Sequence, residues 1–293
     1  MLELHGINRS FSGRRVLSDI DFCVNDGRMT GFVGANGAGK TTTMRIILGV
    51  LSSDSGTVRL NGSDLEASDR RRFGYMPEER GLYPKMKVAE QITYLARLHG
   101  LGPTAARNNT MTLLERLGLG ERANDPVEKL SLGNQQRAQI AASLVHDPEV
   151  LVLDEPFSGL DPIAVETVQA VLKEYAARGI PVLFSSHQLD IVERLCDDLV
   201  IIANGSIRAS GSRDALREEH SAPRYEILLG GDAGWLRDVP DITVIDFDGG
   251  YALFDADPDA AQRVLHSAID RGPVASFAPQ HPSLAQIFKE VIK

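Results

Sequence analysis

Cysteine, tryptophan and long apolar runs are scarce in this sequence. It holds two cysteines and one tryptophan in 293 residues, and no segment has the roughly 20 consecutive apolar residues that a membrane-spanning helix needs. Cys23 and Cys196 both lie within apolar patterns, so we expect buried, reduced thiols without a redox or metal role. The opening residues, MLELHGINRSF, alternate like a strand and do not form a signal peptide. We therefore expect a soluble, cytoplasmic chain whose role at a membrane would depend on a partner.

Basic residues are too few for a protein that binds nucleic acid through its phosphates. The chain carries 31 Lys and Arg against 40 Asp and Glu, a net charge of −9. Residues 221–293 carry −5 of this charge and the first 220 residues carry −4, so neither part has a basic excess. Nucleic acid is not the expected partner. Hydrophobic residues make up 43% of the chain, which is enough for the core of one large or two smaller domains.

Within residues 1–218, the apolar pattern changes from alternating to continuous. Alternating segments within residues 1–30 and 56–62 predict half-buried strands. From Met29 onward, continuous apolar strands such as MTGFV, VLVL, VLFSS and LVIIA are separated by helical patterns. Strands of this kind are typical of a parallel sheet that is covered on both faces. We therefore expect an α/β domain over residues 1–218.

Residues 222–293 follow a different order of elements, βαββαβα. This order suits a small α+β domain of the ferredoxin-like type. The polar segment REEHSAP, residues 217–223, is the expected linker. The elements expected in this second domain are a strand at 224–229, a short helix near Trp235, a hairpin of 242–247 and 251–256, a helix at 258–271, a strand near 274–278 and a helix at 283–292.

A glycine-rich turn that ends in lysine and threonine follows the strand MTGFV. The segment GANGAGKTT stands between this strand and a helix, which is the context of a phosphate-binding loop. Glycines let backbone N–H groups approach an anion closely, and the helix N-terminus adds unpaired donors and a partial positive charge. We expect Lys40 to bind the outer phosphates, Thr41 to hold Mg²⁺ and Thr42 to add a phosphate contact. The expected nucleotide contacts of this loop are Gly34, Asn36, Gly37, Ala38, Gly39, Lys40, Thr41 and Thr42.

Two acids end the apolar strand VLVL. Asp154 and Glu155 stand at the carboxyl end of an expected parallel strand, where open α/β sheets bind ligands. We expect Asp154 to hold Mg²⁺ through water or through Thr41, and Glu155 to orient and polarise the attacking water. Together with the phosphate loop, these acids predict a nucleoside-triphosphate hydrolase.

Over about residues 1–218, the chain resembles the ATP-binding subunits of ABC transporters. Five motifs stand in the order and spacing of that family, and the resemblance implies an ABC-cassette fold with a parallel sheet core, an antiparallel β-subdomain and a helical subdomain. The resemblance gives Phe11 and His187 roles at the nucleotide; the alternatives are that Phe11 is an aromatic residue of the core and that His187 is an ordinary surface histidine. Beside the phosphate loop and the acids, the matching residues are Ser131 and Gly133 of the signature motif, Ser158 to Asp161 of the D-loop, His187 as the switch histidine and Phe11 as the aromatic that stacks on the base.

The resemblance also implies how such a chain works. In the family two subunits pack head to tail, and Ser131 and Gly133 of one subunit close on the ATP that the other subunit holds. It implies a homodimer with ATP and Mg²⁺ as cofactors, and it places Asp161 among the nucleotide contacts. Glu155, His187 and Lys40 are the expected catalytic residues, because they would contact the water and the γ-phosphate.

Two segments depart from the usual wording of the family. The signature reads LSLGN where LSGGQ is commonest, so Leu132 replaces a glycine and Asn134 a glutamine. Glu78, in GYMPEERGLYP, stands where the family usually has a glutamine near Mg²⁺ and the attacking water. We expect Glu78 to sense the metal, with a purely structural acid as the alternative. The hypothesis predicts that Glu78→Gln keeps ATPase activity within roughly tenfold.

The segments that contain these departures, PEERGLYP and LSLGN, are similar to those of the exporter group that includes sodium-efflux and drug-efflux ATPases. The segment PSLAQIF is similar to part of the small C-terminal domain of that group. Without a spanning helix, the chain would act through separate permease subunits at the inner face of the cell membrane. In the family, a short permease helix fits a groove between the sheet core and the helical region after the Glu78 loop. Leu82, Tyr83 and Met86 are its candidate lining residues, with ordinary core packing as the alternative.

Two other functions stay open at this point. A soluble ABC-type ATPase that acts on ribosomes, DNA or cluster assembly is the main alternative. Members that act on ribosomes usually fuse two cassettes, and DNA-repair members carry coiled coils or zinc insertions. A regulatory protein that binds ATP without turnover is the third reading, and the presence of both Glu155 and His187 weighs against it.

Overall fold

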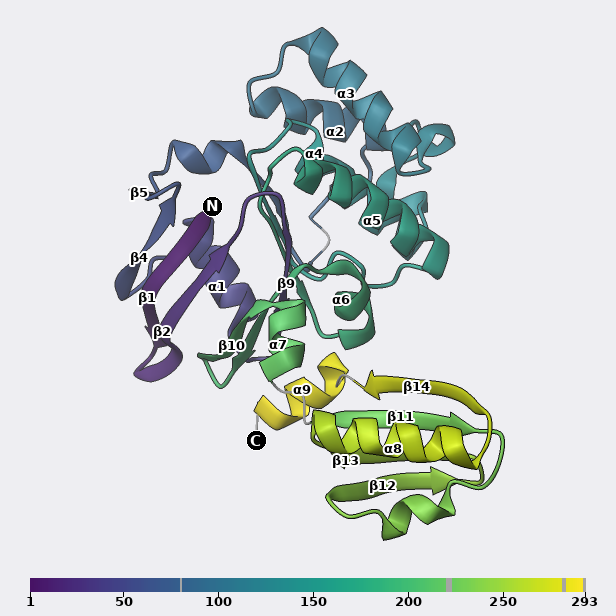
Figure 1. Ribbon diagram of the computed structural model, residues 1–293. Coiled ribbons are helices and arrows are strands. Elements are labelled where there is room, and N and C mark those ends of the chain that lie inside the picture. The colour runs from purple at the N-terminus through teal and green to yellow at the C-terminus, as the bar shows by residue number, and fades with distance from the viewer. Residues whose placement is uncertain (80, 220–222, 281–282, 292–293) are drawn as a thin grey trace. The chain divides into compact units, whose positions relative to one another are not determined.

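The computed structural model describes residues 1–79, 81–219, 223–280 and 283–291 (Figure 1). Contacts between Cα atoms divide the chain into a first unit, built mainly of Met1–Arg213, and a second unit, Asp214–Glu290. This division lies before the expected end of the first domain at residue 218. Part of the expected linker is helical, because α7 (Arg213–Glu219) covers its first residues, and residues 220–222 lie outside the described part.

A six-stranded sheet forms the centre of the first unit. Five neighbouring strands, β9, β3, β8, β7 and β6, run parallel to one another. The sixth strand, β10, pairs antiparallel with β9 at one edge. Every residue of β3, β7 and β8 is buried, which confirms the expected parallel sheet with covered faces. In order across the sheet, the strands are β10 (Ser206–Ser212), β9 (Asp198–Ala203), β3 (Met29–Val33), β8 (Val182–Ser186), β7 (Val150–Leu153) and β6 (Phe73–Met76).

A second, antiparallel sheet packs beside the central one. Its strand order is β2 (Arg14–Val24), β1 (Leu2–Phe11), β4 (Ser55–Leu60) and β5 (Ser63–Asp64). Phe22 of β2 lies 5.3 Å from Phe32 of β3 between ring centroids, within one apolar cluster that also contains Met44 of α1. The expectation of a buried Cys23 is wrong, because the period-two alternation that turns Phe22 inward turns Cys23 to the surface. Cys196 is buried as expected.

Helices cover the central sheet and form a separate helical layer (Figure 1). Helix α6 packs against β3 and β8, and α2, α3 and α4 pack on one another, with α4 also against β6. Pro103 opens α3, and Gly49, with φ of +68°, follows the end of α1. The helices of this unit are α1 (Lys40–Ile47), α2 (Val88–Leu98), α3 (Pro103–Arg116), α4 (Leu132–Leu144), α5 (Pro162–Ala177) and α6 (Leu189–Leu195), with 3₁₀ turns η1 (Asp69–Arg72), η2 (Gly120–Arg122) and η3 (Val127–Lys129).

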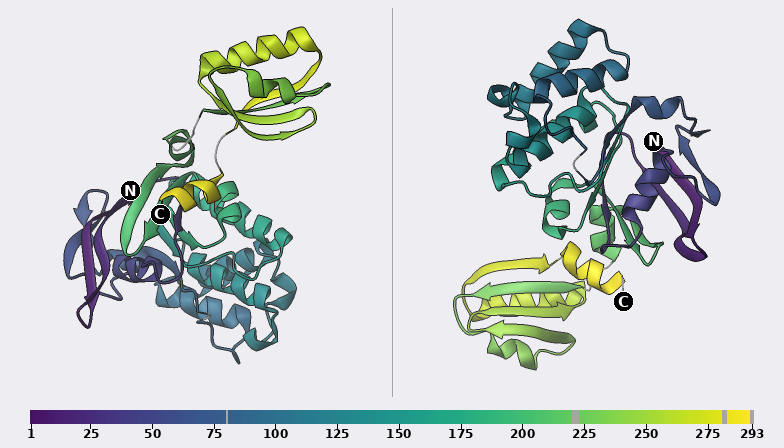
Figure 2. Two further views of the ribbon diagram at one scale, coloured as in Figure 1. Left: turned by 90° about the horizontal axis from the view of Figure 1, so that it is seen from below. Right: turned by 180° about the vertical axis from the view of Figure 1, so that it is seen from behind.

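The second unit is an antiparallel four-stranded sheet with a helix on one face (Figure 2). Its strand order, β12-β13-β11-β14, is the one that the ferredoxin-like arrangement predicts. The first helix of that arrangement is only a 3₁₀ turn here, and α8 supplies the buried helical face of the core. The elements are β11 (Arg224–Leu229), η4 (Gly234–Asp238), β12 (Ile242–Asp248), β13 (Tyr251–Ala256), α8 (Pro258–Arg271), β14 (Val274–Gln280) and α9 (Leu284–Val291).

Among all the described residues, no helix combines the length and the apolar character that crossing a bilayer requires.

Candidate nucleotide-binding site

The loop between β3 and α1 brings the backbone close to an open cleft. A Cβ atom on Gly34 would lie 2.5 Å from the carbonyl oxygen of Ile202, so only glycine fits there. Gly39 is the N-cap of α1 with φ of +116°, a backbone conformation that favours glycine, and no side chain caps this helix. The first N–H groups of α1 are therefore free to bind an anion, and they carry the positive end of the helix dipole.

Lys40 lies inside this loop rather than on the surface. Its side chain is buried, and Nζ donates to the carbonyl oxygen of Gly34 at 2.6 Å and to that of Ala35 at 3.4 Å. Carbonyl dipoles thus hold the ammonium group in place without a carboxylate partner in these contacts. A phosphate group entering the loop would find this charge already oriented.

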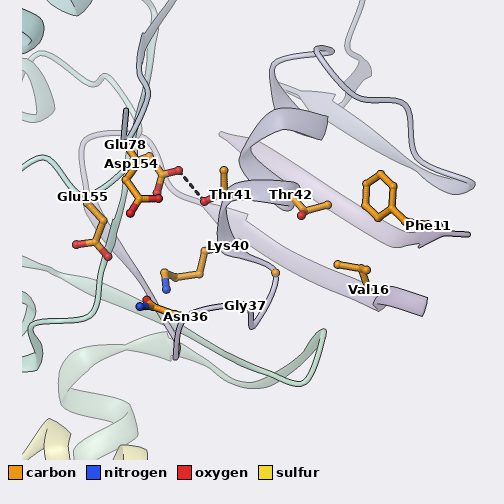
Figure 3. Close-up of a pocket in the computed structure, with 11 residues that line it drawn as sticks. Phe11, Val16, Asn36, Gly37, Lys40, Thr41, Thr42, Glu78, Asp154 and Glu155 are labelled. Carbon is orange, nitrogen blue, oxygen red and sulfur yellow. Dashed lines mark hydrogen bonds between the residues drawn. The ribbon is translucent and has the colours of Figure 1, made fainter. Parts of the chain in front are cut away.

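Thr41, Asp154 and Ser185 form a short chain of hydrogen bonds across three elements, of which Figure 3 shows the bond between Thr41 and Asp154. Thr41 Oγ1 donates to Asp154 Oδ2 at 2.8 Å, and Ser185 Oγ donates to Asp154 Oδ1 at 2.5 Å. The backbone N–H of Asp154 donates to the carbonyl of Met76 on the neighbouring strand at 2.8 Å. Asp154 is only 1% exposed, so its two carboxylate oxygens are held at fixed positions at the end of β7.

Glu155 has a left-handed backbone, with φ of +52°, at the turn after β7. Its N–H donates to Ser185 Oγ at 2.9 Å, and its Oε1 lies 3.0 Å from Nδ1 of His187. Glu155 is 8% exposed, whereas the side chain of His187 is half exposed. A non-glycine residue held in this sparsely populated conformation is typical of functional sites, where the surrounding structure compensates the backbone strain.

The cleft that Lys40, Thr41, Asp154 and Glu155 line has a volume of about 550 Å³. In Figure 3, Glu78, Asp154 and Glu155 lie on one side of the phosphate loop, and Phe11 and Val16 lie on the other. The Phe11 ring is 42% exposed, and the Arg9 guanidinium lies 4.8 Å from its centroid. The lining residues are Phe11, Val16, Asn36, Gly37, Gly39, Lys40, Thr41, Thr42, Glu78, Asp154 and Glu155.

The expected residues of the site divide into two groups. Those that line the cleft come from the phosphate loop, the strand-end acids, the Glu78 loop and Phe11, whereas Gly34 and Ala38 lie in the loop without lining the cleft. His187 reaches the site through Glu155. Ser131, Gly133 and Asp161 are not among the lining residues of this chain's own cleft.

Ser131 and Asp161 each begin a helix. Ser131 caps α4 and accepts a hydrogen bond from the N–H of Asn134 at 3.3 Å, and Asp161 caps α5 and accepts one from the N–H of Ala164 at 2.8 Å. Leu132, beside Ser131, is 60% exposed. The start of α4 is therefore exposed at Ser131 and Leu132.

The residues of the cleft fit a bound Mg²⁺. Thr41, Asp154 and Glu78 offer the hard oxygen donors that this ion prefers. Among the described residues, no three His, Cys, Asp or Glu side chains gather into a metal site. Mg²⁺ usually takes one or two carboxylates and completes its shell with water and substrate phosphates, and this set of residues suits that mode.

Three residues near the site were not predicted from the sequence. Ser185 touches both acids, Val16 lines the cleft beside Phe11, and the buried Gln136 donates to the carbonyl oxygen of Glu155 at 2.9 Å. Ser185 stands in the motif LFSSH, so a polar residue at the end of a buried strand was a visible signal. For Gln136, the sequence holds no such signal, because its contacts are far away in the chain.

A second groove, of about 590 Å³, lies on the helical layer between α2 and α3. Met86 is among its lining residues, and Leu82 and Tyr83 are not. Tyr83 is instead 63% exposed, and its N–H donates to Gln91 Oε1 at 3.1 Å. The lining residues are Met86, Lys87, Ala89, Glu90, Thr93, Tyr94, Arg97, Arg107, Met111, Ala123 and Asn124.

Two protein families match the two parts of the chain. Residues 17–158 match the family described as ABC transporter, and residues 211–292 match the C-terminal domain of ATP-binding proteins like DrrA1-3. The first match covers the phosphate loop, the acids and the α4 start, and the second covers the ferredoxin-like unit.

Relatives and solved structures agree with this assignment. The ABC transporter ATP-binding protein YhaQ of Bacillus subtilis (strain 168) is 36% identical over 293 residues, which covers all of this chain and 98% of the relative. The Nod factor export ATP-binding protein I of Ralstonia nicotianae is 37% identical and covers 72% of this chain and 67% of its own length. A solved ATP-binding subunit of an ABC transporter aligns with a TM-score of 0.70 and 32% identity over 75% of this chain and 92% of its own. The chain therefore belongs to the family of ABC transporter ATP-binding proteins.

Proposed function

We propose that this chain binds ATP with Mg²⁺ in the cleft at the carboxyl ends of β3 and β7, hydrolyses it, and thereby powers export by separate membrane permease subunits. The observation that carries the proposal is the meeting of the phosphate loop, the Thr41–Asp154 hydrogen bond and Glu155 in one cleft. Fixed donors for phosphates, oxygen ligands for a metal and a carboxylate for water are what phosphoryl transfer requires.

The phosphate loop would bind the nucleotide through its backbone and Lys40. The free N–H groups at the start of α1 and the oriented Lys40 ammonium would bind the β- and γ-phosphates, with Thr42 beside them. Phe11 would stack on the base, because its ring is exposed at the far end of the same cleft. None of the described residues that line the cleft is placed to read the edge of the base, so stacking on Phe11 would favour adenine only weakly.

Mg²⁺ would be held by Thr41 and Asp154, with Glu78 next to it, and bound there it would neutralise charge on the phosphate oxygens. Ser185 fixes one oxygen of Asp154, which leaves the other oxygen directed at Thr41. Glu78 has a carboxylate where the family usually has the amide of a glutamine. A carboxylate cannot donate a hydrogen bond to the attacking water, so Glu78 would respond to the metal instead. Glu78→Gln is therefore expected to keep ATPase activity within roughly tenfold.

Glu155 would orient and polarise the attacking water. It is buried at the strand end, and its backbone is held by Ser185. His187 Nδ1 lies beside the Glu155 carboxylate and would hold it in place before the γ-phosphate arrives, after which the imidazole would contact that phosphate.

A head-to-tail homodimer would complete each site. Ser131 and Gly133 do not line this chain's own cleft, and the start of α4 is exposed at Ser131 and Leu132, which supports their use on the ATP of a partner subunit. ATP would close two such subunits on each other, and hydrolysis would separate them. Asp161, next to this surface, would contact the nucleotide only in the closed dimer.

The ATPase part of the proposal is tested with Glu155→Gln. Loss of a positioned base costs about 10²–10⁴-fold in rate, so turnover should fall by that factor while ATP binding and ATP-dependent dimerisation remain. Glu149→Gln is the matched control, because Glu149 is a half-exposed surface acid paired with Arg72. Unchanged turnover in Glu155→Gln would contradict the role of this carboxylate.

The transport part is tested in cells. Tagged Glu155→Gln, crosslinked in its native cell, should sediment with membranes together with one or two multispanning proteins. The name of the Ralstonia relative, a Nod factor export protein, supports export as the direction. A chain that stays in the soluble fraction, or that follows ribosomes or DNA, would contradict transport and leave only the ATPase.

A further inference from the structure

Helix α4 carries two buried glutamines on one face. Gln136 is 3% exposed and Gln139 is 4% exposed. Residues three positions apart lie on the same side of a helix, so both amide groups are directed away from the helical layer and towards the central sheet, where α4 packs against β6. Buried amides at successive turns that donate to other segments fix those segments relative to the helix.

Gln136 holds the turn that contains Glu155. Its Nε2 donates to the carbonyl oxygen of Glu155 at 2.9 Å and to that of Pro156 at 3.2 Å. The backbone of Glu155 is therefore fixed from two directions, by Gln136 at its carbonyl and by Ser185 at its N–H. This double hold keeps a non-glycine residue in the left-handed region and sets the direction of its carboxylate.

Gln139 holds the loop that contains Glu78. Its Nε2 donates to the carbonyl oxygen of Pro77 at 2.6 Å and to that of Glu79 at 3.3 Å, on both sides of Glu78. One helix thus holds both loops whose acids line the cleft, although these loops are far apart in the sequence.

The same helix begins at the exposed Ser131, and Gly133 lies in its first turn. From Gly133 to Gln139 is six residues, or about 9 Å along a helix axis. An α-helix of this length moves as a rigid body. A displacement at its first turn is therefore carried to the amides of Gln136 and Gln139, and through them to the two loops.

We propose that Gln136 and Gln139 are positioning residues that couple the start of α4 to the placement of Glu155 and Glu78 in the same chain. This inference rests on the proposed head-to-tail dimer, in which the start of α4 meets the ATP of the partner. ATP bound by one subunit would then position the Glu155 carboxylate of the other subunit. The two sites would therefore hydrolyse ATP cooperatively rather than independently.

The test uses Gln136→Met, which keeps the length of the side chain and removes its donors. Gln135→Met is the matched control, because Gln135 Nε2 also donates to two carbonyl groups, of Val127 and Leu130, but these precede α4 and carry no acid of the cleft. Thermal melting of both variants is the check that each is folded. The measurements are kcat, KM and the Hill coefficient for ATP hydrolysis.

We expect Gln136→Met to lower kcat about 10- to 100-fold, as small misplacements of a catalytic group do. Its affinity for ATP should stay within about twofold, because the phosphate loop is untouched. The Hill coefficient should fall from above one in the wild type to about one in the variant, since the two sites lose their coupling. Gln139→Met should reduce cooperativity with a smaller loss of kcat.

A second readout does not need turnover. Amide hydrogen exchange at residues 155–158 should slow when ATP is added to the wild type and to Gln135→Met, but not in Gln136→Met. Equal loss in Gln135→Met, or wild-type kcat and Hill coefficient in Gln136→Met, would overturn the coupling. If the wild type binds ATP without hydrolysing it, the proposed function fails, and the exchange data alone decide this inference.

Discussion

The central sheet of the first unit and the sheet of the second unit differ in how they are covered. Strands β3, β7 and β8 are buried along their whole length, whereas β13 alternates strictly between buried and partly exposed residues. A parallel sheet that is covered on both faces can expose only the loops at its strand ends. The chemistry of the first unit is accordingly concentrated at those ends.

The second unit has one apolar face and one mixed face. Residues such as Ile227, Phe254 and Val264 form the core between the sheet and α8, while Leu228, on the opposite face, is 43% exposed. A parallel sheet that is covered on both faces thus leaves its strand ends open for a site, whereas an antiparallel sheet that is covered on one face leaves its other face exposed.

Phe254→Ala should have the largest effect and separate the two units. Phe254 is fully buried and its ring lies among those of Tyr225 and Phe277. The substitution should destabilise the second unit by about 3–5 kcal/mol. Calorimetry should then show an early transition for that unit, with ATP binding retained. Ile245→Ala, at a 48% exposed position of β12, is the control, and loss of ATP binding in Phe254→Ala would show that the units do not fold separately.

Ser185→Ala should have the next largest effect, confined to the first unit. The hydroxyl donates to Asp154 and accepts from the N–H of Glu155, so its removal leaves both acids less well placed. We expect kcat to fall about 10- to 100-fold and the Mg²⁺ requirement to rise. Ser143→Ala removes another buried hydroxyl, bonded to Ile140 within α4, and should leave kcat near that of the wild type. Equal kcat in Ser185→Ala would contradict the positioning role.

The acid stability of the first unit should depend on His146. Burial, with a smaller effect from the stacked His99 ring 3.7 Å away, lowers the pKa of His146 from 6.5 to about 4. The unfolded chain therefore binds a proton that the folded chain does not, and stability falls as the pH decreases from 6.5 to about 4. His146→Gln should flatten this part of the pH–stability curve. His266→Gln, at an exposed position of the second unit, should leave it unchanged, and an unchanged slope in His146→Gln would refute the assignment.

The two cysteines provide the smallest effect. Cys23 is exposed on β2, whereas burial raises the pKa of Cys196 to about 12. A thiol reagent at pH 8 should label one cysteine in the folded protein and both after unfolding, without loss of ATPase activity. Cys23→Ser should abolish the native labelling. Labelling of both thiols in the folded chain would show that α6 opens readily.

The local elements and the phosphate chemistry were determined by the sequence itself. Loop, strand end and helix start stand next to one another in the chain, so GANGAGKTT and VLVLDE could be interpreted without a structure. The order of strands and helices in residues 224–291 was also predicted, because hairpin turns and helix caps are local signals. The exposure of Cys23 could also have been predicted from the sequence, because inward and outward residues alternate along β2, but that prediction was not made.

Only the tertiary structure decided which distant groups meet. Ser185 reaches Asp154 from 31 positions away, and Gln139 reaches Pro77 from 62 positions away. The helix that replaces part of the expected linker was decided there too. Contacts of this kind depend on how elements pack, and packing follows from burial over the whole fold rather than from any local pattern.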